Sequence, residues 1–290
     1  MKKNEIPLCV AAVDGDLDRV VELLGHGLDP NQRTDATPAE PAGRTALHYA
    51  AMFNETEIVA ALIDAGAHVN ARDADGDSPI FCCSNIATTR LLLDSGAVIG
   101  FTGKFGHSVL HRYCSPETLQ LLIDAGANLE ARDKKGRTPI FQMMADLDRL
   151  NFVLDRGVDF RARDNDGSSV LYQKSGYLVS DDCVRRLVEL GFDINEPNPI
   201  DGSTALHFHL DISEYDHMSD SAFYDPWFLK CLLDCGANPL IRNHEELNAF
   251  DLADRLYRDP DPDDPDWDAD YWNEARDVVL QCLKEASLQS

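Results

Sequence analysis

Three histidines recur in one sequence context, and their chemistry is the first question that this chain raises. His48, His111 and His207 each follow a leucine in segments of the form Thr/Ser-x-Leu-His. A neutral imidazole is a common metal ligand, and it also serves as a general acid or base near neutral pH. Three such residues in one protein therefore suggest a zinc site or a hydrolytic centre.

The regular recurrence of these histidines argues against a shared site. They occupy equivalent positions in different units of a repeat, so they are separated by whole repeat widths, on the order of 10 Å for packed helices. A zinc ion needs its ligand atoms within about 2.3 Å. We therefore expect each imidazole to have a structural role inside its own unit.

Aspartate-rich segments are the second candidates for chemistry. DADGDS (73–78) and DNDGSS (164–169) look like fragments of a calcium loop, but neither is followed by the bidentate acid that an EF-hand needs at its twelfth position. In the stretch 259–270, Asp264 stands where that loop requires glycine, and prolines interrupt it. We expect at most weak, adventitious binding of divalent cations.

Other catalytic and metal patterns are incomplete. HEELN (244–248) begins like a metallopeptidase helix but lacks its second histidine, and no phosphate-binding glycine loop or nucleophile elbow occurs. Cys231 and Cys235 are one helical turn apart, yet no second ligand pair stands at zinc spacing. The eight cysteines are expected to be reduced packing residues. The sequence predicts no catalytic residue, no metal and no cofactor.

The elements that position these residues form a repeat. In each unit a glycine turn precedes a Thr or Ser that can cap a first short helix, and a second helix ends at a glycine. The helix-closing glycines are Gly27, Gly66, Gly96, Gly126, Gly157, Gly191 and Gly236. The variant segments are TALHYAA (45–51), SPIFCCS (78–84), SVLHRYC (108–114), TPIFQMM (138–144), SVLYQKS (169–175), TALHFHL (204–210) and NAFDLAD (248–254). Units of this kind bury their apolar faces on their neighbours.

These units resemble the ankyrin repeat, whose pattern runs D-x-x-G-x-T-P-L-H-x-A-A and then L-L-x-x-G-A-D-V-N. The most specific match runs from GRTALHYAA (43–51) to LIDAGAHVNARD (62–73). The resemblance implies an all-α solenoid of about eight helix-turn-helix units with short β-hairpin finger turns. It also implies that the histidine ties its turn to the first helix. Three consecutive units are shortened, and we expect the loss between their two helices.

We expect one domain over 1–290. An amino-terminal capping unit covers 1–31, central repeats cover 45–245, and a carboxy-terminal capping unit with an acidic loop covers 246–290.

Charge narrows the class of partner. The chain has 51 acidic and 26 basic residues and a net charge of -25, which disfavours nucleic acid and favours a basic protein surface. We expect no membrane partner, because no run of 18 apolar residues occurs and the start MKKNEIPLCV turns polar at once. The expected location is cytoplasmic.

Much of the acidity is local. Residues 201–275 hold 19 of the acidic side chains and 4 of the basic ones. Aromatic residues are interleaved with the acids, a combination suited to a cationic partner, although the acids could simply solvate a loop. The contact candidates in this stretch are Tyr215, Tyr224, Trp227, Asp261, Asp263, Asp264, Asp266 and Trp267.

The resemblance implies a second contact surface, because the finger tips and first helices of such repeats usually contact the partner. The corresponding candidates are Arg44, Asp75, Asp77, Lys104, Phe105, His107, Lys134, Lys135, Arg137, Asn165 and Asp166. The central tips are basic. Phe105 is either an interface anchor or a residue that packs on the adjacent tip.

These features predict a non-catalytic protein-binding module, monomeric before binding. With no other domain in the pattern, binding itself would be the activity, by masking or inhibiting a partner. An immunity-type protein that neutralises a basic toxin or enzyme fits the charge. The alternatives are an adaptor that bridges two proteins and a metal-dependent enzyme.

Overall fold

The structure is a computed structural model that describes residues 6–36, 42–112, 114–172, 179–210, 226–256 and 269–288. The chain divides into two compact units. Unit 1 comprises Met1–Met143 and Asp148–Val158, and unit 2 comprises Met144–Leu147 and Asp159–Ser290. Each unit is described by itself, and the single domain expected over 1–290 stays a prediction.

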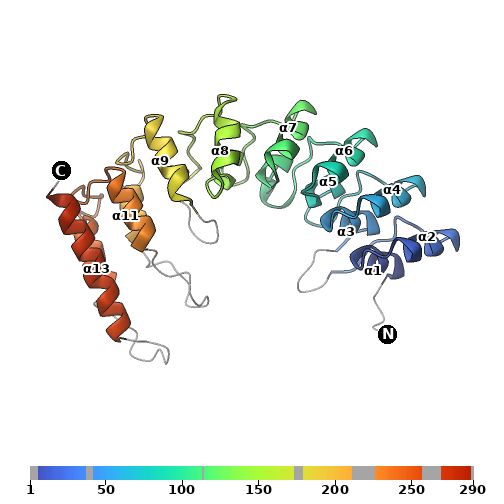
Figure 1. Cartoon of the computed structure of the whole chain (residues 1–290), viewed down its shortest axis with the longest axis horizontal. Coiled ribbons are helices and arrows are strands. Elements are labelled where there is room, and N and C mark those ends of the chain that lie inside the picture. The colour runs from blue at the N-terminus through green and yellow to red at the C-terminus, as the bar shows by residue number, and fades with distance from the viewer. Residues whose placement is uncertain are drawn as a thin grey trace. The chain divides into compact units, whose positions relative to one another are not determined.

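Unit 1 is a series of short helical hairpins (Figure 1). Its helices are α1 (Pro7–Val13), α2 (Leu17–Gly25), α3 (Ala46–Met52), α4 (Thr56–Asp64), α5 (Pro79–Cys82), α6 (Ile86–Asp94), α7 (Pro116–Asp124) and, apart from its first residue, α8 (Leu147–Leu154). Three short 3-10 helices complete it, namely η1 (Lys104–Gly106), η2 (Val109–His111) and η3 (Pro139–Gln142).

The helices of unit 1 stack in two rows, as Figure 1 shows. In one row α1 packs on α3 and α3 on α5, while in the other α2 packs on α4, α4 on α6 and α6 on α7. Each hairpin thus buries its apolar face on the next one.

Unit 2 contains α9 (Asp181–Glu189), α10 (Ala205–Leu210), α11 (Pro226–Asp234), α12 (Ala249–Leu256) and α13 (Ala269–Ser287). Here α10 packs on α12, and α11 packs on α13. Across the described residues of both units the structure has helices and no strand, which confirms the all-α fold class.

The helix-closing glycines have the backbone that the pattern predicts. All seven, from Gly27 to Gly236, have a positive φ, between 76° and 96°. In this left-handed region a side chain would clash with the backbone, so glycine ends the helix with least strain. The prediction that these glycines end the second helix of each unit is confirmed.

The shortening of the central units differs from the expectation. Helix α3 has seven residues and α5 has four, yet three residues connect each of them to the following helix. The loss therefore falls in the last turn of the first helix and not in the connection. With only one turn left, the first helices of the next two units, η2 and η3, take the tighter 3-10 form.

One part of the core comes from the apolar residue that stands two positions after the capping residue of each repeat. In six of the seven repeat segments the side chain at this position is buried, and in the seventh Phe250 is partly exposed; the six are Leu47, Ile80, Leu110, Ile140, Leu171 and Leu206. Arg149 in α8 is the buried arginine among the polar residues of the interior, at 0% exposure in the part of the chain that the structure describes. Its guanidinium donates to the backbone carbonyls of Gln142 (3.4 Å) and Arg112 (3.5 Å).

Candidate functional site

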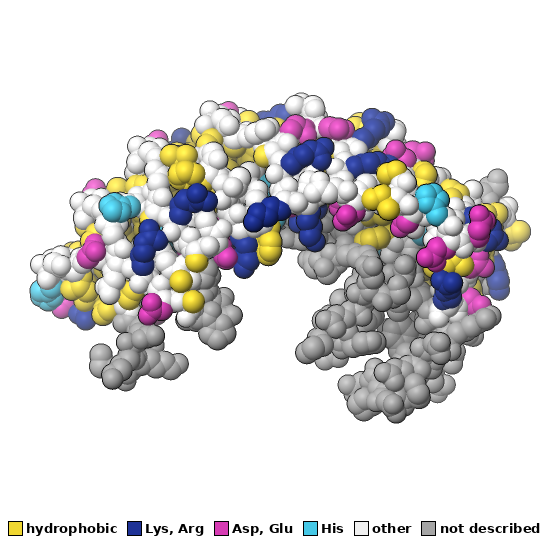
Figure 2. Space-filling model, turned by 180° about the vertical axis from the view of Figure 1, so that it is seen from behind, with side chains coloured by type: hydrophobic (Ala, Val, Ile, Leu, Met, Phe, Trp, Pro, Cys, Tyr) yellow, Lys and Arg dark blue, Asp and Glu magenta, His cyan; other side chains and the backbone are white. Residues whose placement is uncertain are grey.

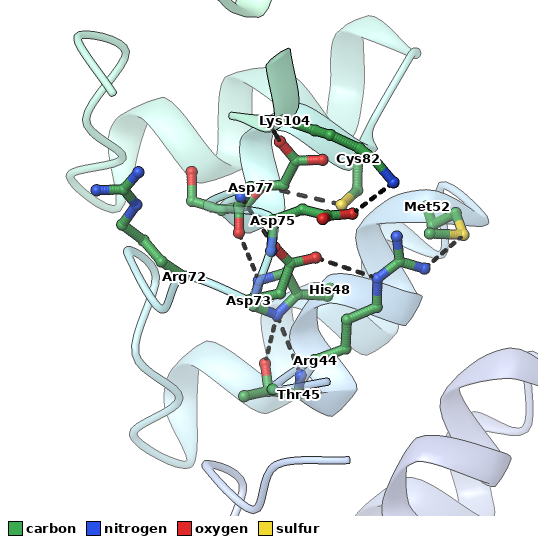
Figure 3. A network of polar contacts seen from close by, with 12 residues as sticks. Arg44, Thr45, His48, Met52, Arg72, Asp73, Asp75, Asp77, Cys82 and Lys104 are labelled. Carbon is green, nitrogen blue, oxygen red and sulfur yellow. Dashed lines mark hydrogen bonds and ion pairs between the residues drawn. The ribbon is translucent and has the colours of Figure 1, made fainter. Parts of the chain in front are cut away.

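The three recurring histidines each link one repeat to the next. The Nδ1 atom of His48 accepts a hydrogen bond from the Thr45 N–H (3.1 Å), and its Nε2 donates to the Asp77 carbonyl (3.2 Å), as Figure 3 shows. His111 and His207 repeat the arrangement with the carbonyls of Arg137 and Leu247, both at 3.0 Å. Both ring nitrogens are used, so the predicted structural role is confirmed.

Burial keeps these imidazoles neutral. It lowers the pKa of His48 to about 4, and it also lowers the pKa of His111 and of His207. A proton on Nδ1 would face the N–H that this atom accepts from. A buried, neutral imidazole with both nitrogens engaged is poorly placed to exchange protons with a substrate.

The calcium-like aspartates close their own finger turns. Asp73 Oδ1 accepts hydrogen bonds from the backbone N–H groups of Asp75 and Asp77, both at 3.0 Å. Asp133 does the same for Lys135 (2.8 Å) and Arg137 (2.9 Å), and Asp164 follows the same rule. Sequence reasoning missed this role, although each aspartate stands five residues before the capping Ser or Thr of its repeat.

The expected β-hairpin form of the fingers is limited to turn hydrogen bonds. The Asp73 N–H donates to the Asp77 carbonyl (2.9 Å), and the Asp133 N–H donates to the Arg137 carbonyl (2.9 Å). Within the described ranges these turns carry no strand. The carboxylate therefore supplies rigidity that a longer ladder would otherwise give.

The finger at 103–107 departs from this rule because Gly103 stands in place of the aspartate. Asp77, from the preceding finger, supplies the missing carboxylate: its Oδ1 accepts from the Lys104 N–H (3.1 Å; Figure 3). A Cβ added at Gly103 would lie 1.7 Å from that oxygen. Burial raises the pKa of Asp77, and the Lys104 N–H opposes this. Asp77 is 6% exposed, so its side chain stabilises the turn and leaves little surface for a partner.

Three further candidates lie beside finger aspartates, and the two arginines among them pair with the carboxylates. Arg44 Nε lies 3.3 Å from Asp73 Oδ2, and Arg137 Nη2 lies 2.9 Å from Asp133 Oδ2. His107 Nε2 approaches the same Asp133 oxygen at 3.4 Å. The three side chains are 13%, 17% and 14% exposed, respectively, so they present only an edge to solvent.

The Asp133 carboxylate is stabilised in its charged form. Burial raises its pKa, but the backbone and side-chain hydrogen bonds from Arg137 lower it more, and the net shift is downward.

Five residues at the tips of the fingers are at least partly exposed, and together they are called the finger surface: Asp75, Lys104, Phe105, Lys134 and Lys135. Lys104 Nζ pairs with Asp75 Oδ2 (3.2 Å), and the Phe105 carbonyl accepts from the Lys134 N–H (2.8 Å). These contacts join three successive tips into one surface of unit 1.

Phe105 is the most unusual residue of the finger surface. Its side chain is 56% exposed, and its backbone has φ 59° and ψ 13°. The ring lies 5.9 Å from the His107 ring and 5.4 Å from Lys104 Nζ, and neither contact buries it. A left-handed conformation is strained for a bulky residue.

The remaining candidates fall in two groups. In unit 2, Asn165 and Asp166 are exposed, and the Asp166 carbonyl accepts from Asn198 Nδ2 (3.0 Å). Outside the described residues lie Tyr215, Tyr224, Asp261, Asp263, Asp264, Asp266 and Trp267, and also the side chain of Trp227.

The cysteine pair of α11 is a thiol pair. Burial raises the pKa of Cys231 to about 12, and burial also raises the pKa of Cys235. Thiolates are the zinc ligands, so this environment disfavours metal binding. In the part of the chain that the structure describes, no group of three or more His, Cys, Asp and Glu side chains could hold a metal ion. The helices described there also include none of the length and apolarity needed to span a bilayer.

The face seen in Figure 2 shows how charge is distributed over the described residues. Lys and Arg side chains (dark blue) lie interspersed with Asp and Glu (magenta), although acidic residues are about twice as numerous in the chain. The acidity therefore does not form one continuous surface on this face.

Comparisons with known proteins agree with the geometry. Residues 8–102 match the family model for ankyrin repeats (3 copies). The chain is 32% identical over 77 residues to the Schizosaccharomyces pombe "Ankyrin repeat-containing protein P1E11.10", covering 27% of this chain and 34% of that protein. It is 35% identical over 83 residues to the Escherichia coli "Putative ankyrin repeat protein YahD", covering 28% of this chain and 38% of that protein. The matches thus span little more than a third of these relatives. Residues 8–102 therefore match ankyrin repeats, and repeats of this generally non-catalytic family indicate a protein–protein interaction module.

Proposed function

We propose that this protein is a non-catalytic binding protein that masks or inhibits a partner protein, and that the finger surface of unit 1 is one of its contact areas. The observation that carries the proposal is Phe105, which is 56% exposed at a φ of 59°. Such a conformation costs on the order of 1–3 kcal/mol. An aromatic residue that is both strained and exposed contributes little to folding, whereas aromatic residues dominate binding energy at interfaces.

The absence of catalysis in this proposal is supported by the hydrogen bonds that engage the candidate catalytic side chains. The histidines and finger aspartates that suggested chemistry are engaged in turn and inter-repeat hydrogen bonds. Groups that are engaged in this way support the fold and have little freedom to act on a substrate.

Charge supports a partner with a basic surface, such as a basic toxin or enzyme. Residues 201–275 hold 19 of the 51 acidic side chains and only 4 of the 26 basic ones. Such a stretch attracts a cationic partner at long range and raises the association rate. We propose that the protein is monomeric before binding and cytoplasmic. The location is supported by eight free cysteines, five of them buried.

A second candidate function is an adaptor that bridges two proteins. It is favoured by the finger surface, whose exposed cations have the opposite sign to the 201–275 stretch. The finger cations attract an acidic surface and the 201–275 stretch attracts a basic one, and these two surfaces can belong to one partner or to two.

The proposal is tested by affinity capture from an extract of the native cells, with wild-type and Phe105→Ser proteins as baits. We expect the variant to lose the partner that the wild type captures. Phe53→Ser is the matched control, because Phe53 is also an exposed phenylalanine of unit 1 (49%) but ends α3, away from the finger surface. Equal capture by both variants and the wild type would remove the finger surface from the proposal.

A further inference from the structure

The finger surface carries a local charge that is opposite to that of the whole chain. Lys104, Lys134 and Lys135 are exposed, in a protein with a net charge of -25. The finger aspartates that would offset them are buried: the side chains of Asp73 and Asp133 are both 0% exposed. Asp75 is 27% exposed and already pairs with Lys104. The charge presented to a partner at these tips is therefore positive.

The cations and the exposed ring belong to one continuous surface. The Phe105 carbonyl accepts from the Lys134 N–H (2.8 Å). A Cβ added at Gly106 would lie only 3.1 Å from that same nitrogen, so the two tips touch. One partner segment can therefore contact Phe105 and the flanking lysines together.

Arg112 extends the positive charge behind the tips. It is exposed, at the end of η2. Burial is the main cause of the raised pKa of Asp77 and the lowered pKa of His107, and the Arg112 guanidinium acts on both groups. Arg112 ends η2, the short helix that follows the finger at 103–107, so it stands next to this finger along the chain.

We infer that the finger surface binds an acidic segment of a partner protein, in which carboxylates flank an apolar side chain. The apolar side chain packs on the exposed ring of Phe105, and the carboxylates pair with Lys104, Lys135 and Arg112. This inference rests on the proposed function, because it names the chemistry of the partner at the proposed contact area. A nucleic acid would also present anions, but the net charge of -25 repels a long phosphate backbone.

Dimensions set the length of the segment. Successive tips of packed repeats are on the order of 10 Å apart, and an extended chain spans about 3.3 Å per residue. Three tips therefore accommodate on the order of seven residues. At about 0.15 M ionic strength the Debye length is about 8 Å, so such a segment responds to the local cations more than to distant acids.

The test is selection of a displayed library of random twelve-residue peptides on the immobilised full chain at physiological ionic strength. We expect the enriched peptides to combine several Asp or Glu residues with an aromatic or aliphatic residue. Their affinities, measured by fluorescence anisotropy with the labelled peptides, should fall at least tenfold in Phe105→Ser and in the double variant Lys104→Glu/Lys135→Glu. The matched control is Lys230→Glu/Lys284→Glu, which makes the same change in net charge at two exposed lysines of unit 2 and should bind normally.

Several outcomes would overturn the inference: enrichment of basic peptides, no enrichment, or acidic peptides whose affinity is unchanged by both finger variants. Tighter binding of a single-stranded oligonucleotide than of the peptides would assign the surface to nucleic acid. Self-association lost in Phe105→Ser would assign it to a second copy of this chain. If Phe105-dependent capture from the extract persists while basic peptides are enriched, the proposed function stands and only the acidic partner fails.

Discussion

The third finger of unit 1 (103–107) and the fourth (133–137) obtain the carboxylate that accepts hydrogen bonds from their turn in different ways. In the fourth finger, Asp133 closes its own turn with hydrogen bonds to Lys135 and Arg137 at 2.8 and 2.9 Å. In the third, Gly103 stands in the place of that aspartate, and the carboxylate comes from Asp77 of the finger before (3.1 Å). The carboxylate of the fourth turn is therefore local, whereas that of the third comes from its neighbour.

This difference shows how a repeat becomes specialised. Without a carboxylate of its own, the third turn adopts a backbone in which both Phe105 and Gly106 have positive φ values, 59° and 77°. The same turn carries the exposed aromatic ring. A change that weakens one turn locally thus coincides with the feature that most resembles a binding anchor.

The largest expected loss of stability is at Gly103, because the absence of a side chain there leaves room for the Asp77 carboxylate. Gly103→Ala would place a Cβ 1.7 Å from Asp77 Oδ1. We expect a loss of about 3 kcal/mol in the free energy of unfolding, because the buried carboxylate must move and lose its hydrogen bond. Chemical denaturation followed by circular dichroism measures it. Gly100→Ala is the control, since nothing lies within 4 Å of an added Cβ there. Equal effects of the two changes would contradict the proposed packing.

The second effect is destabilisation by acid through the histidines that link the repeats. The folded-state pKa of His48 is about 4, against 6.5 for the free group. Between these values the unfolded chain binds more protons, so the free energy of unfolding falls as pH decreases from about 7 to 4. One pKa unit corresponds to about 1.4 kcal/mol, so His48 alone contributes on the order of 3 kcal/mol.

Denaturation curves over this pH range would show the effect, and His48→Gln should flatten the dependence. His111 and His207 act in the same direction, since burial lowers the pKa of each. A stability that is constant between pH 7 and 4 in the wild type would exclude this role.

A third, smaller effect tests the borrowed carboxylate directly. Asp77→Ser removes the acceptor of the Lys104 N–H and should lower the free energy of unfolding by about 1–2 kcal/mol. Adding Gly103→Asp restores an aspartate at the position that Asp133 occupies in the fourth finger, and it should recover much of the loss. In the presence of Asp77, the same Gly103→Asp change should be destabilising. Additive effects in this double-mutant cycle would show that the two positions are independent.

The smallest expected change in stability has the opposite sign. Phe105→Gly relieves a positive φ of 59° and should raise the free energy of unfolding by about 1 kcal/mol while it abolishes partner capture. Thermal unfolding and the capture assay together measure the two readouts. A variant that is less stable than the wild type would show that the ring supports the fold, as in packing on the adjacent tip.

Regular positions of the repeat could be predicted from single residues. The helix-closing glycines, the buried Leu or Ile positions and the three histidine links each recur at one fixed place in the repeat, so one assignment explains every member of a set. The constant spacing of Asp73, Asp133 and Asp164 before the capping residue indicates their shared role in the same way, although the segments of Asp73 and Asp164 also resemble fragments of a calcium loop.

Irregular positions could not be predicted in this way. Asp77 looked like a surface candidate, yet it is 6% exposed because it serves a glycine 26 residues later. Arginine is usually a surface residue, yet Arg149 is buried and donates hydrogen bonds to two backbone carbonyls. In both cases the deciding contact lies in another unit of the repeat, where no local pattern reports it.

The amino-acid sequence by itself determined the helical repeat, its turns and the inward-facing residues, because these depend on backbone preferences and on burial between identical neighbours. Only the tertiary structure decided which finger side chains remain for a partner. Arg44 and Asp77 make contacts between fingers, and His107 lies beside Asp133 of the next finger, whereas Phe105 and Lys135 stay exposed. The physical reason is that a charged side chain is left exposed or is neutralised according to what the adjacent repeat presents to it, a property of pairs of units and not of one.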